Sequence, residues 1–389
     1  MKRWGMVISL LIVLICAAGC GGGSSAPDGN TDTEPGQLAL KQDKEQTQNA
    51  DTGTRPSEEA TAGAEQPGEE PGPAQPAPRA DKGSGQKEAP AGTGGAGKNS
   101  ASPASEVSLW VTRDYAKSPL YNDRVALKPG DSVMDILKNN LDVNTQYGGG
   151  FVEAINGLRS GYTGSDKKTR DWFYYANGII TSTGALDYKP APGDVIWWDY
   201  HDWGGAVFTP ALIGAFPEPF ISGYRGQNPG TAVLTAPGCE RQGHQLAEHL
   251  RNLGAKNVTV QPYNEKTVTK SEKITLVIGL WKSFAGEQFW QGVQKQRKKT
   301  GLFIELAPDY FATLDMKGEI VSRYHQNVGA ITATGSGMGD PTPVWLVTGL
   351  DQPGLDRAVN LLISSPGSFK QYFGAVVSGE KVLPVPVVN

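Results

Sequence analysis

Hydrophobic and polar residues alternate in several short segments between residues 106 and 215. This alternation is typical of strands with one buried face, because neighbouring side chains of a strand point to opposite faces. The predicted strands are 106–112, a short strand that begins near Asp123 and ends before the turn at Pro129-Gly130, 148–158, 171–179 and 194–203. Residues 132–141 instead carry apolar side chains at helical spacing, and Asp131 or Ser132 is placed to cap that helix. One helix with four or five mostly antiparallel strands predicts a β-grasp-like α+β domain over residues 106–215.

Residues 216–389 follow a different pattern, in which apolar strands alternate with amphipathic helices. The predicted strands are 231–236, 257–261, 273–280, 301–306, 329–335 and 343–350, and the predicted helices are 239–255, 286–300 and 353–364. This order favours an α/β domain with a partly parallel sheet, entered through a connector rich in Pro and Gly. Cys239 begins the first of these helices, and we expect it to be a small core residue.

Residues 20–105 consist mainly of Gly, Pro, Ala, Glu and Ser, with acidic residues in excess over basic ones. Such a segment cannot bury enough apolar surface to offset its ordering entropy, so we expect a disordered, solvated tether. The whole chain has 389 residues and a formal net charge of −4. Nothing in this mildly acidic balance indicates nucleic-acid binding.

Residues 1–19 have the layout of a secretory signal, with Lys2 and Arg3 before an apolar run. The run is shorter than the roughly 20 residues that span a bilayer. Ala17, Ala18, Gly19 and Cys20 resemble the lipobox of bacterial lipoproteins. That resemblance implies lipidation of Cys20 and an anchored protein on the outer face of the bacterial cytoplasmic membrane. The alternative is an ordinary signal peptide with an incidental cysteine.

Enzymatic motifs are scarce in this sequence. The glycine-rich segment Gly335–Pro341 lacks the lysine of a P-loop and is interpreted as a surface loop. Asp351 is interpreted as a turn residue, although it follows a strand where α/β proteins often bind ligands. The sequence contains neither a Gly-x-Ser-x-Gly nor a His-Glu-x-x-His pattern. We therefore predict no catalytic residue and no metal site.

The segment 193–203, GDVIWWDYHDW, concentrates aromatic and acidic residues in one strand. One face carries Ile196, Trp198 and Tyr200, and the other carries Trp197, Asp199, His201 and Trp203. The first face is wholly apolar or aromatic and is expected to pack on the helix 132–141. The second face is amphipathic and is expected to meet solvent, the connector or a flat ligand. In the competing interpretation, Trp197 and Trp203 form a small core beneath the connector.

The order of motifs in residues 106–203 resembles the C-terminal β-domain of transcobalamin and intrinsic factor, a module also found in bacterial surface proteins of unknown function. The resemblance is carried mainly by Ile155-Asn156-Gly157, Trp172, Tyr175-Ala176-Asn177-Gly178 and Gly193-Asp194. In the animal carriers this domain is one half of a clamp around cobalamin, which it contacts through main-chain groups and aromatic side chains. The other half is a large helical barrel, which this chain lacks. The α/β domain or a partner protein would have to replace it.

The resemblance implies a corrinoid site on two neighbouring strands. The implied ligand-binding residues are Trp172, Tyr174, Tyr175, Asn177, Trp197, Asp199, His201 and Trp203. Asn177 would hydrogen-bond the corrin amides, and His201 would approach cobalt unless it is simply a strand residue. No cofactor is required, and cobalamin is a ligand in this hypothesis.

Three functions remain open on the sequence. The leading one is capture of a corrinoid at the cell surface for delivery to a membrane transporter. The second is a structural or adhesive module that binds a wall polymer or a protein, and the third is an extracytoplasmic enzyme. A corrinoid binder should expose Trp197, His201 and Trp203 in a concave site, whereas an adhesive module should bury them or show them on a flat surface. An enzyme should gather acids or His near Gly335–Pro341 and Asp351.

Overall fold

The computed structural model describes residues 105–163, 167–206 and 208–388. The signal peptide, the lipidation site Cys20 and the tether lie outside these residues and remain predictions. No helix in the described ranges has the length and apolar character needed to cross a bilayer.

The first folded part is built on a five-stranded sheet in the order β2-β1-β8-β6-β7. Its strands are β1 (Glu106–Arg113), β2 (Ser118–Ala126), β6 (Arg170–Ala176), β7 (Ile179–Ile180) and β8 (Val195–Asp202). The central strands β1 and β8 pair in parallel, and the other neighbours pair antiparallel. One face of this sheet is covered by α2 (Val133–Asn140) and a small sheet of β3 (Val143–Gln146), β4 (Phe151–Ile155) and β5 (Leu158–Arg159).

Helix α2 begins where the sequence predicts it. Ser132 accepts a hydrogen bond from the Asp135 backbone, and Asp135 accepts one from the Ser132 backbone. Its buried side chains share one core with Ile196, Trp198 and Tyr200 of β8, as expected for that face of the strand.

The second folded part contains a seven-stranded sheet in the order β10-β9-β11-β16-β15-β17-β18. Its strands are β9 (Thr231–Thr235), β10 (Val258–Pro262), β11 (Ile274–Leu280), β15 (Val328–Thr334), β16 (Val344–Gly349), β17 (Gly374–Ser378) and β18 (Lys381–Val385). The first four strands in the sheet order are parallel, and the last three continue antiparallel. The sheet is therefore partly parallel, as predicted.

Helices and a small separate sheet complete this part. The helices are α3 (Glu240–Asn252), α4 (Glu265–Thr269), α5 (Gln288–Lys295), α6 (Arg297–Thr300) and α7 (Gln352–Ser364). The separate sheet contains β12 (Ile304–Leu306), β13 (Phe311–Leu314) and β14 (Ile320–Tyr324). Cys239 is buried directly before α3, which agrees with its interpretation as a core residue.

Two expectations for this part differ from the structure. The single helix expected over 286–300 is broken at Gln296 into α5 and α6. After Val293 the sequence is polar and mostly cationic, so no apolar side chain extends the buried face of the helix. The strands β13, β14, β17 and β18 were not predicted. They are short, and β14 has no fully buried side chain to mark its inner face.

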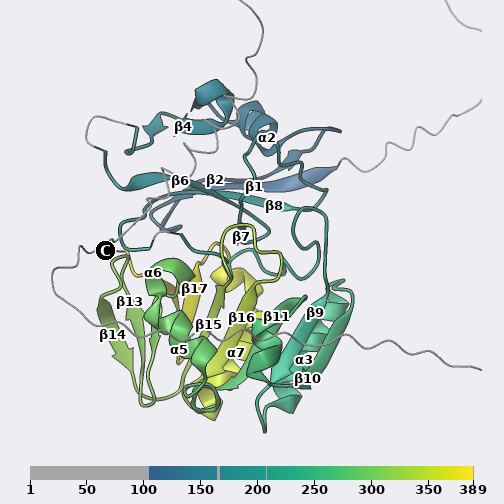
Figure 1. The fold of residues 1–389 in the computed structure, drawn as a ribbon, viewed down its shortest axis with the longest axis vertical. Helices are drawn as coiled ribbons and strands as arrows, with labels where there is room; N and C mark the ends of the chain where they lie inside the picture. Colours follow the sequence, from purple (N-terminus) through teal and green to yellow (C-terminus); the bar gives the residue numbers. More distant parts are fainter. Residues whose placement is uncertain (1–104, 164–166, 207, 389) are drawn as a thin grey trace, which may run out of the picture.

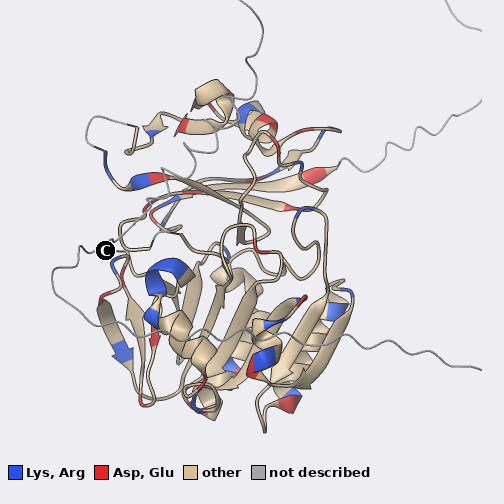
Figure 2. Cartoon of the chain, in the orientation of Figure 1, with Lys and Arg blue, Asp and Glu red and all other residues tan. Residues whose placement is uncertain are grey.

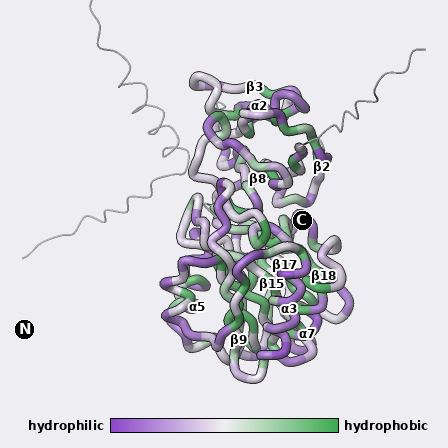
Figure 3. Tube along the Cα trace, turned by 90° about the vertical axis from the view of Figure 1, so that its right-hand side faces the viewer, coloured by the Kyte–Doolittle hydropathy of each residue, from purple (hydrophilic) through white to green (hydrophobic). Residues whose placement is uncertain are grey.

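The two folded parts share one hydrophobic core. Trp110, Tyr115 and Trp197 of the first part belong to the same buried cluster as Phe303 and Phe373 of the second. The Phe373 ring lies 5.4 Å from the Trp197 ring and 5.1 Å from the Tyr115 ring. The five-stranded sheet therefore lies across the strand ends of the larger sheet, as a smaller lobe on a larger one (Figures 1 and 3).

Candidate functional site

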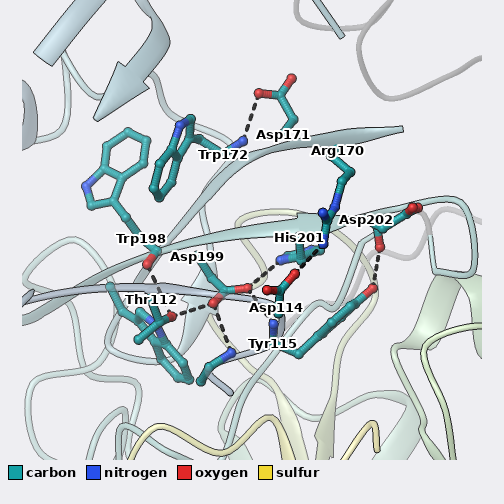
Figure 4. A network of polar contacts seen from close by, with 12 residues as sticks. Thr112, Asp114, Tyr115, Arg170, Asp171, Trp172, Trp198, Asp199, His201 and Asp202 are labelled. Carbon is teal, nitrogen blue, oxygen red and sulfur yellow. Dashed lines mark hydrogen bonds and ion pairs between the residues drawn. The ribbon is translucent and has the colours of Figure 1, made fainter. Parts of the chain in front are cut away.

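The carboxylate of Asp199 on β8 is buried at the junction of the two parts, in a network shown in Figure 4. Its Oδ2 accepts the Tyr115 backbone N–H at 3.1 Å and lies 2.7 Å from His201 Nδ1. Its Oδ1 accepts the Ala116 backbone N–H at 3.0 Å and the hydroxyl of Thr112. Each carboxylate oxygen thus has two polar partners. Such partners offset the free-energy cost of removing a carboxylate from water.

The neighbouring side chains of the same strand face are equally enclosed. His201 is stacked between the rings of Tyr115, at 4.4 Å, and Phe173, at 4.5 Å. Trp197 has no exposed surface, and its indole N–H donates to the Thr112 hydroxyl at 2.8 Å. These contacts come from β1, β6 and the second folded part, so the face is the inner surface of the junction.

This burial overturns the expectation that the face of Trp197, Asp199 and His201 meets solvent or a ligand, and it agrees with the competing interpretation that Trp197 belongs to a core. Tyr115 and Phe373 cover this face, and Phe303 packs in turn on Tyr115. The sequence had suggested the connector as the cover. A corrin cobalt could not reach the His201 ring without separation of the two parts. The cobalt contact suggested for His201 is therefore not supported by this geometry.

Two further predicted ligand residues are also buried. Asn177 has a φ of +53° in the turn after β6, and its amide donates to Asp194 Oδ1 at 2.8 Å and to the Gly223 carbonyl at 2.9 Å. Its Oδ1 accepts the Val195 backbone N–H. Asn177 therefore ties the turn to β8 and the connector. Tyr175 has no exposed surface and packs against Trp197 and Phe373.

The remaining predicted residues gather at a different place, an aromatic cleft of about 230 Å³. Its aromatic walls are Phe151, Trp172, Phe173, Tyr174, Trp198, Trp203 and Phe208. The Tyr174 and Trp198 rings are stacked at 4.8 Å. Only Trp172, Tyr174 and Trp203 among these walls were predicted from the sequence. Figure 4 shows Trp172 and Trp198 on the side of the sheet away from the Asp199 network.

The cleft lies at an open edge of the sheet. Strand β6 pairs with β7 only at Tyr175 and Ala176, so β7 leaves the first five residues of β6 uncovered. Along this edge the Arg170 carbonyl accepts from Gly161 and the Tyr174 carbonyl accepts from Thr181. Because backbone groups alternate in direction along a strand, the Trp172 carbonyl is directed to the same edge.

Polar groups are few in the cleft. The indole N–H of Trp198 is buried and has no hydrogen-bond partner among the described residues. A buried donor of this kind is unfavourable unless a ligand or water meets it. Burial also raises the pKa of Asp171 to about 6, although hydrogen bonds from the Trp172 backbone and from Ser160 oppose the shift.

A loop of the second part closes one end of the cleft. The glycine-rich segment Gly335–Pro341 carries Met338, which lines the cleft with 47% of its surface exposed. The Gly339 backbone N–H donates to the Ile180 carbonyl at 2.7 Å. Gly339 has a φ of +73°, and a Cβ there would lie 2.1 Å from Ser182 Oγ. Only glycine fits this close approach, so the loop is docked on β7 rather than free at the surface.

The residues considered for catalysis have structural roles. Asp351 caps α7 by accepting the Gly354 backbone N–H at 2.9 Å, and it also accepts the Asn327 backbone N–H. Asp340 accepts hydrogen bonds from Ser336 and Thr342 inside its own loop. In the described ranges no group of His, Cys, Asp or Glu has the arrangement of a metal site.

Comparisons with known proteins bear on the first folded part. The model of a domain of unknown function, DUF4430, matches residues 130–202, well under half of the chain. A crystal structure of haptocorrin in complex with Cbi is 15% identical, with 25% of this chain and 26% of that chain covered and a TM-score of 0.21. A putative metal binding protein from Ruminococcus gnavus ATCC 29149 is 14% identical, with 25% and 96% covered and a TM-score of 0.20. No curated protein matches the chain.

Replacing Asp199 by Ala tests the buried network. The substitution leaves Thr112, His201 and two backbone N–H groups without their acceptor, so we expect the free energy of unfolding to fall by about 3–5 kcal/mol. Asp123→Ala, on exposed β2, should change it by less than about 0.5 kcal/mol. Urea unfolding followed by tryptophan fluorescence measures both. Equal effects of the two substitutions would show that the network does not stabilise the junction.

The pKa of Asp171 predicts a pH-dependent effect on stability. A carboxyl that is harder to ionise when folded binds its proton more tightly in the folded state, so stability is lost as the pH rises from about 4 to about 6. Asp171→Asn removes this ionisation and keeps an acceptor for the Trp172 N–H. We expect the free energy of unfolding of the variant, relative to that of the wild type, to increase by up to roughly 3 kcal/mol between pH 4 and pH 7.5. A stability difference that is the same at both pH values would refute the assignment.

Proposed function

We propose that this chain is a membrane-anchored, extracytoplasmic lipoprotein that binds a ligand in the aromatic cleft without catalysing a reaction on it. The observation that carries this proposal is the group of aromatic side chains around the open edge of β6. Aromatic walls with a few polar groups are characteristic of sites for organic ligands. The sheet order, with α2 on one face and a central parallel pair, supports the assignment of a β-grasp-like ligand-binding domain.

A corrinoid is the first ligand to test. Trp197 and His201 are buried, as expected for an adhesive module rather than for a corrinoid binder, so this proposal rests on the aromatic cleft, which Trp203 lines. The cleft volume of about 230 Å³ is below the range of roughly 300–1,000 Å³ that encloses a whole drug-sized ligand. In this proposal the cleft therefore holds one edge of the corrin, and the rest stays outside or meets a partner. In this proposal the amide groups of a corrin donate to the Trp172 carbonyl at the open edge of β6. Delivery to a membrane transporter would follow capture.

A calorimetric titration of the full-length protein with cyanocobalamin and hydroxocobalamin tests this proposal. Trp203→Ala removes a wall and Gly339→Ala displaces the closing loop, so each should weaken binding at least about tenfold. Gly337→Ala is the matched control, because a Cβ there meets no atom within 4 Å. Circular dichroism establishes that each variant is folded.

The two cobalamins also distinguish the cleft from the buried face. Since His201 is enclosed, we expect similar affinities for both forms and no spectral sign of imidazole on cobalt. A spectral change seen only with hydroxocobalamin, and lost in His201→Gln, would place the corrinoid at the junction instead. No binding of either form at high micromolar concentration would refute corrinoid capture, and binding unaffected by Trp203→Ala would refute the cleft as its site.

A further inference from the structure

A second cavity, of about 490 Å³, lies in the second folded part between α4, α5 and the loop Gly335–Pro341. This hydroxyl-lined groove shares that loop with the aromatic cleft but differs from it in chemistry. The hydroxyl groups that line it belong to Thr269, Ser271, Thr300, Thr334, Ser336 and Thr342. Two amide side chains, Gln288 and Gln296, and a single aromatic ring, Phe289, also line it. The carboxylate of Asp340 lines it as well and accepts from the Ser336 and Thr342 hydroxyls.

The hydroxyl groups of the groove present acceptors to a ligand. Each of the six donates its proton inside the protein; for example, Ser271 donates to the Lys273 carbonyl at 2.8 Å, and Thr300 to the Val293 carbonyl at 2.9 Å. A hydroxyl that has used its proton keeps lone pairs for accepting. The groove therefore suits a ligand rich in hydrogen-bond donors, such as hydroxyl groups.

Cationic side chains continue from one end of the groove. Gln296 lines both the groove and an adjoining hollow of about 400 Å³ at the junction of α5 and α6. Lys295, Lys298 and Lys299 are exposed in this hollow, and no ion pair holds them to any residue that the structure describes. By contrast, Arg297 pairs with Glu305 at 3.1 Å. Lys295 ends α5, and the basic residues of α6 form a blue segment in Figure 2.

From these two features we infer that the groove binds a polymer of polyol units joined by phosphodiesters. The hydroxyls of the polyol would donate to the Ser and Thr oxygens in the groove, and a phosphate would lie against the three lysines. A neutral glycan would leave the lysines unused, and a bare polyanion would leave the acceptors of the groove without donors. This function is separate from ligand binding in the aromatic cleft.

The test uses the full-length protein and a synthetic glycerol-phosphate oligomer with a fluorescent end label, followed by anisotropy. Gly292→Gln fills the groove, and it does so without a clash because a Cβ at Gly292 meets no atom within 4 Å. Since Gln is a better helix former than Gly, loss of folding is not expected. Gly292→Gln and Lys298→Gln/Lys299→Gln should each weaken binding about tenfold or more. The control Lys317→Gln/Lys381→Gln removes two exposed lysines elsewhere and should leave binding unchanged.

Competing polymers decide whether both features are used. The proposal requires that neutral dextran and inorganic polyphosphate compete poorly with the oligomer. Equal competition by polyphosphate, together with no effect of Gly292→Gln, would show that the oligomer binds through surface charge alone and would overturn the proposal. Equal competition by dextran would also overturn it, because the lysines would then not be used. Cobalamin titration of Gly292→Gln should match the wild type, so failure of this inference and failure of the proposed cleft function are distinguishable.

Discussion

The buried carboxylate of Asp199 organises the junction on which both cavities depend. Asp114, Tyr115 and Ala116 all have left-handed φ angles between +55° and +64°, which is unfavourable by about 1–3 kcal/mol for each residue other than glycine. Two backbone N–H groups of this turn point at Asp199, as in the backbone nests that hold anions. The carboxylate thus stabilises a strained turn, and the turn places the Tyr115 ring between His201 and the second folded part.

From this junction the two cavities follow as consequences. With the inner face of the five-stranded sheet closed, the aromatic side chains around the open edge of β6 line the aromatic cleft, and its three Trp walls are largely buried. The docked sheet also brings β7 against the glycine-rich loop, which then forms a wall of the aromatic cleft on one side and of the hydroxyl-lined groove on the other. Residues of this single loop therefore line both cavities, which differ in chemistry.

Local patterns identified many of the elements but not their partners. The cap at Ser132, the helix α2 and the strands β6 and β8 follow from side-chain spacing, because capping and alternation act within a few residues. The burial of Trp197 and His201 depends on Phe373, which is distant in sequence. Phe373 directly precedes β17, a strand that no sequence pattern predicted. Trp198 and Phe173 were missed as cleft walls, because the cleft forms where β7 stops pairing with β6, which is a tertiary feature. Asp171 was not predicted as a cleft residue either. The sequence feature that could have marked it is an acidic residue directly before the aromatic residues of β6.

Native-state hydrogen exchange at the Tyr115 and Ala116 amides of the full-length protein tests the central claim, that the Asp199 network locks the two parts into one unit. If it does, both amides exchange only through global unfolding, with the same free energy as the most protected amides of β11. Exchange at the rate of an open surface loop, while β11 stays protected, would contradict the account, because the two parts would then separate in the native state.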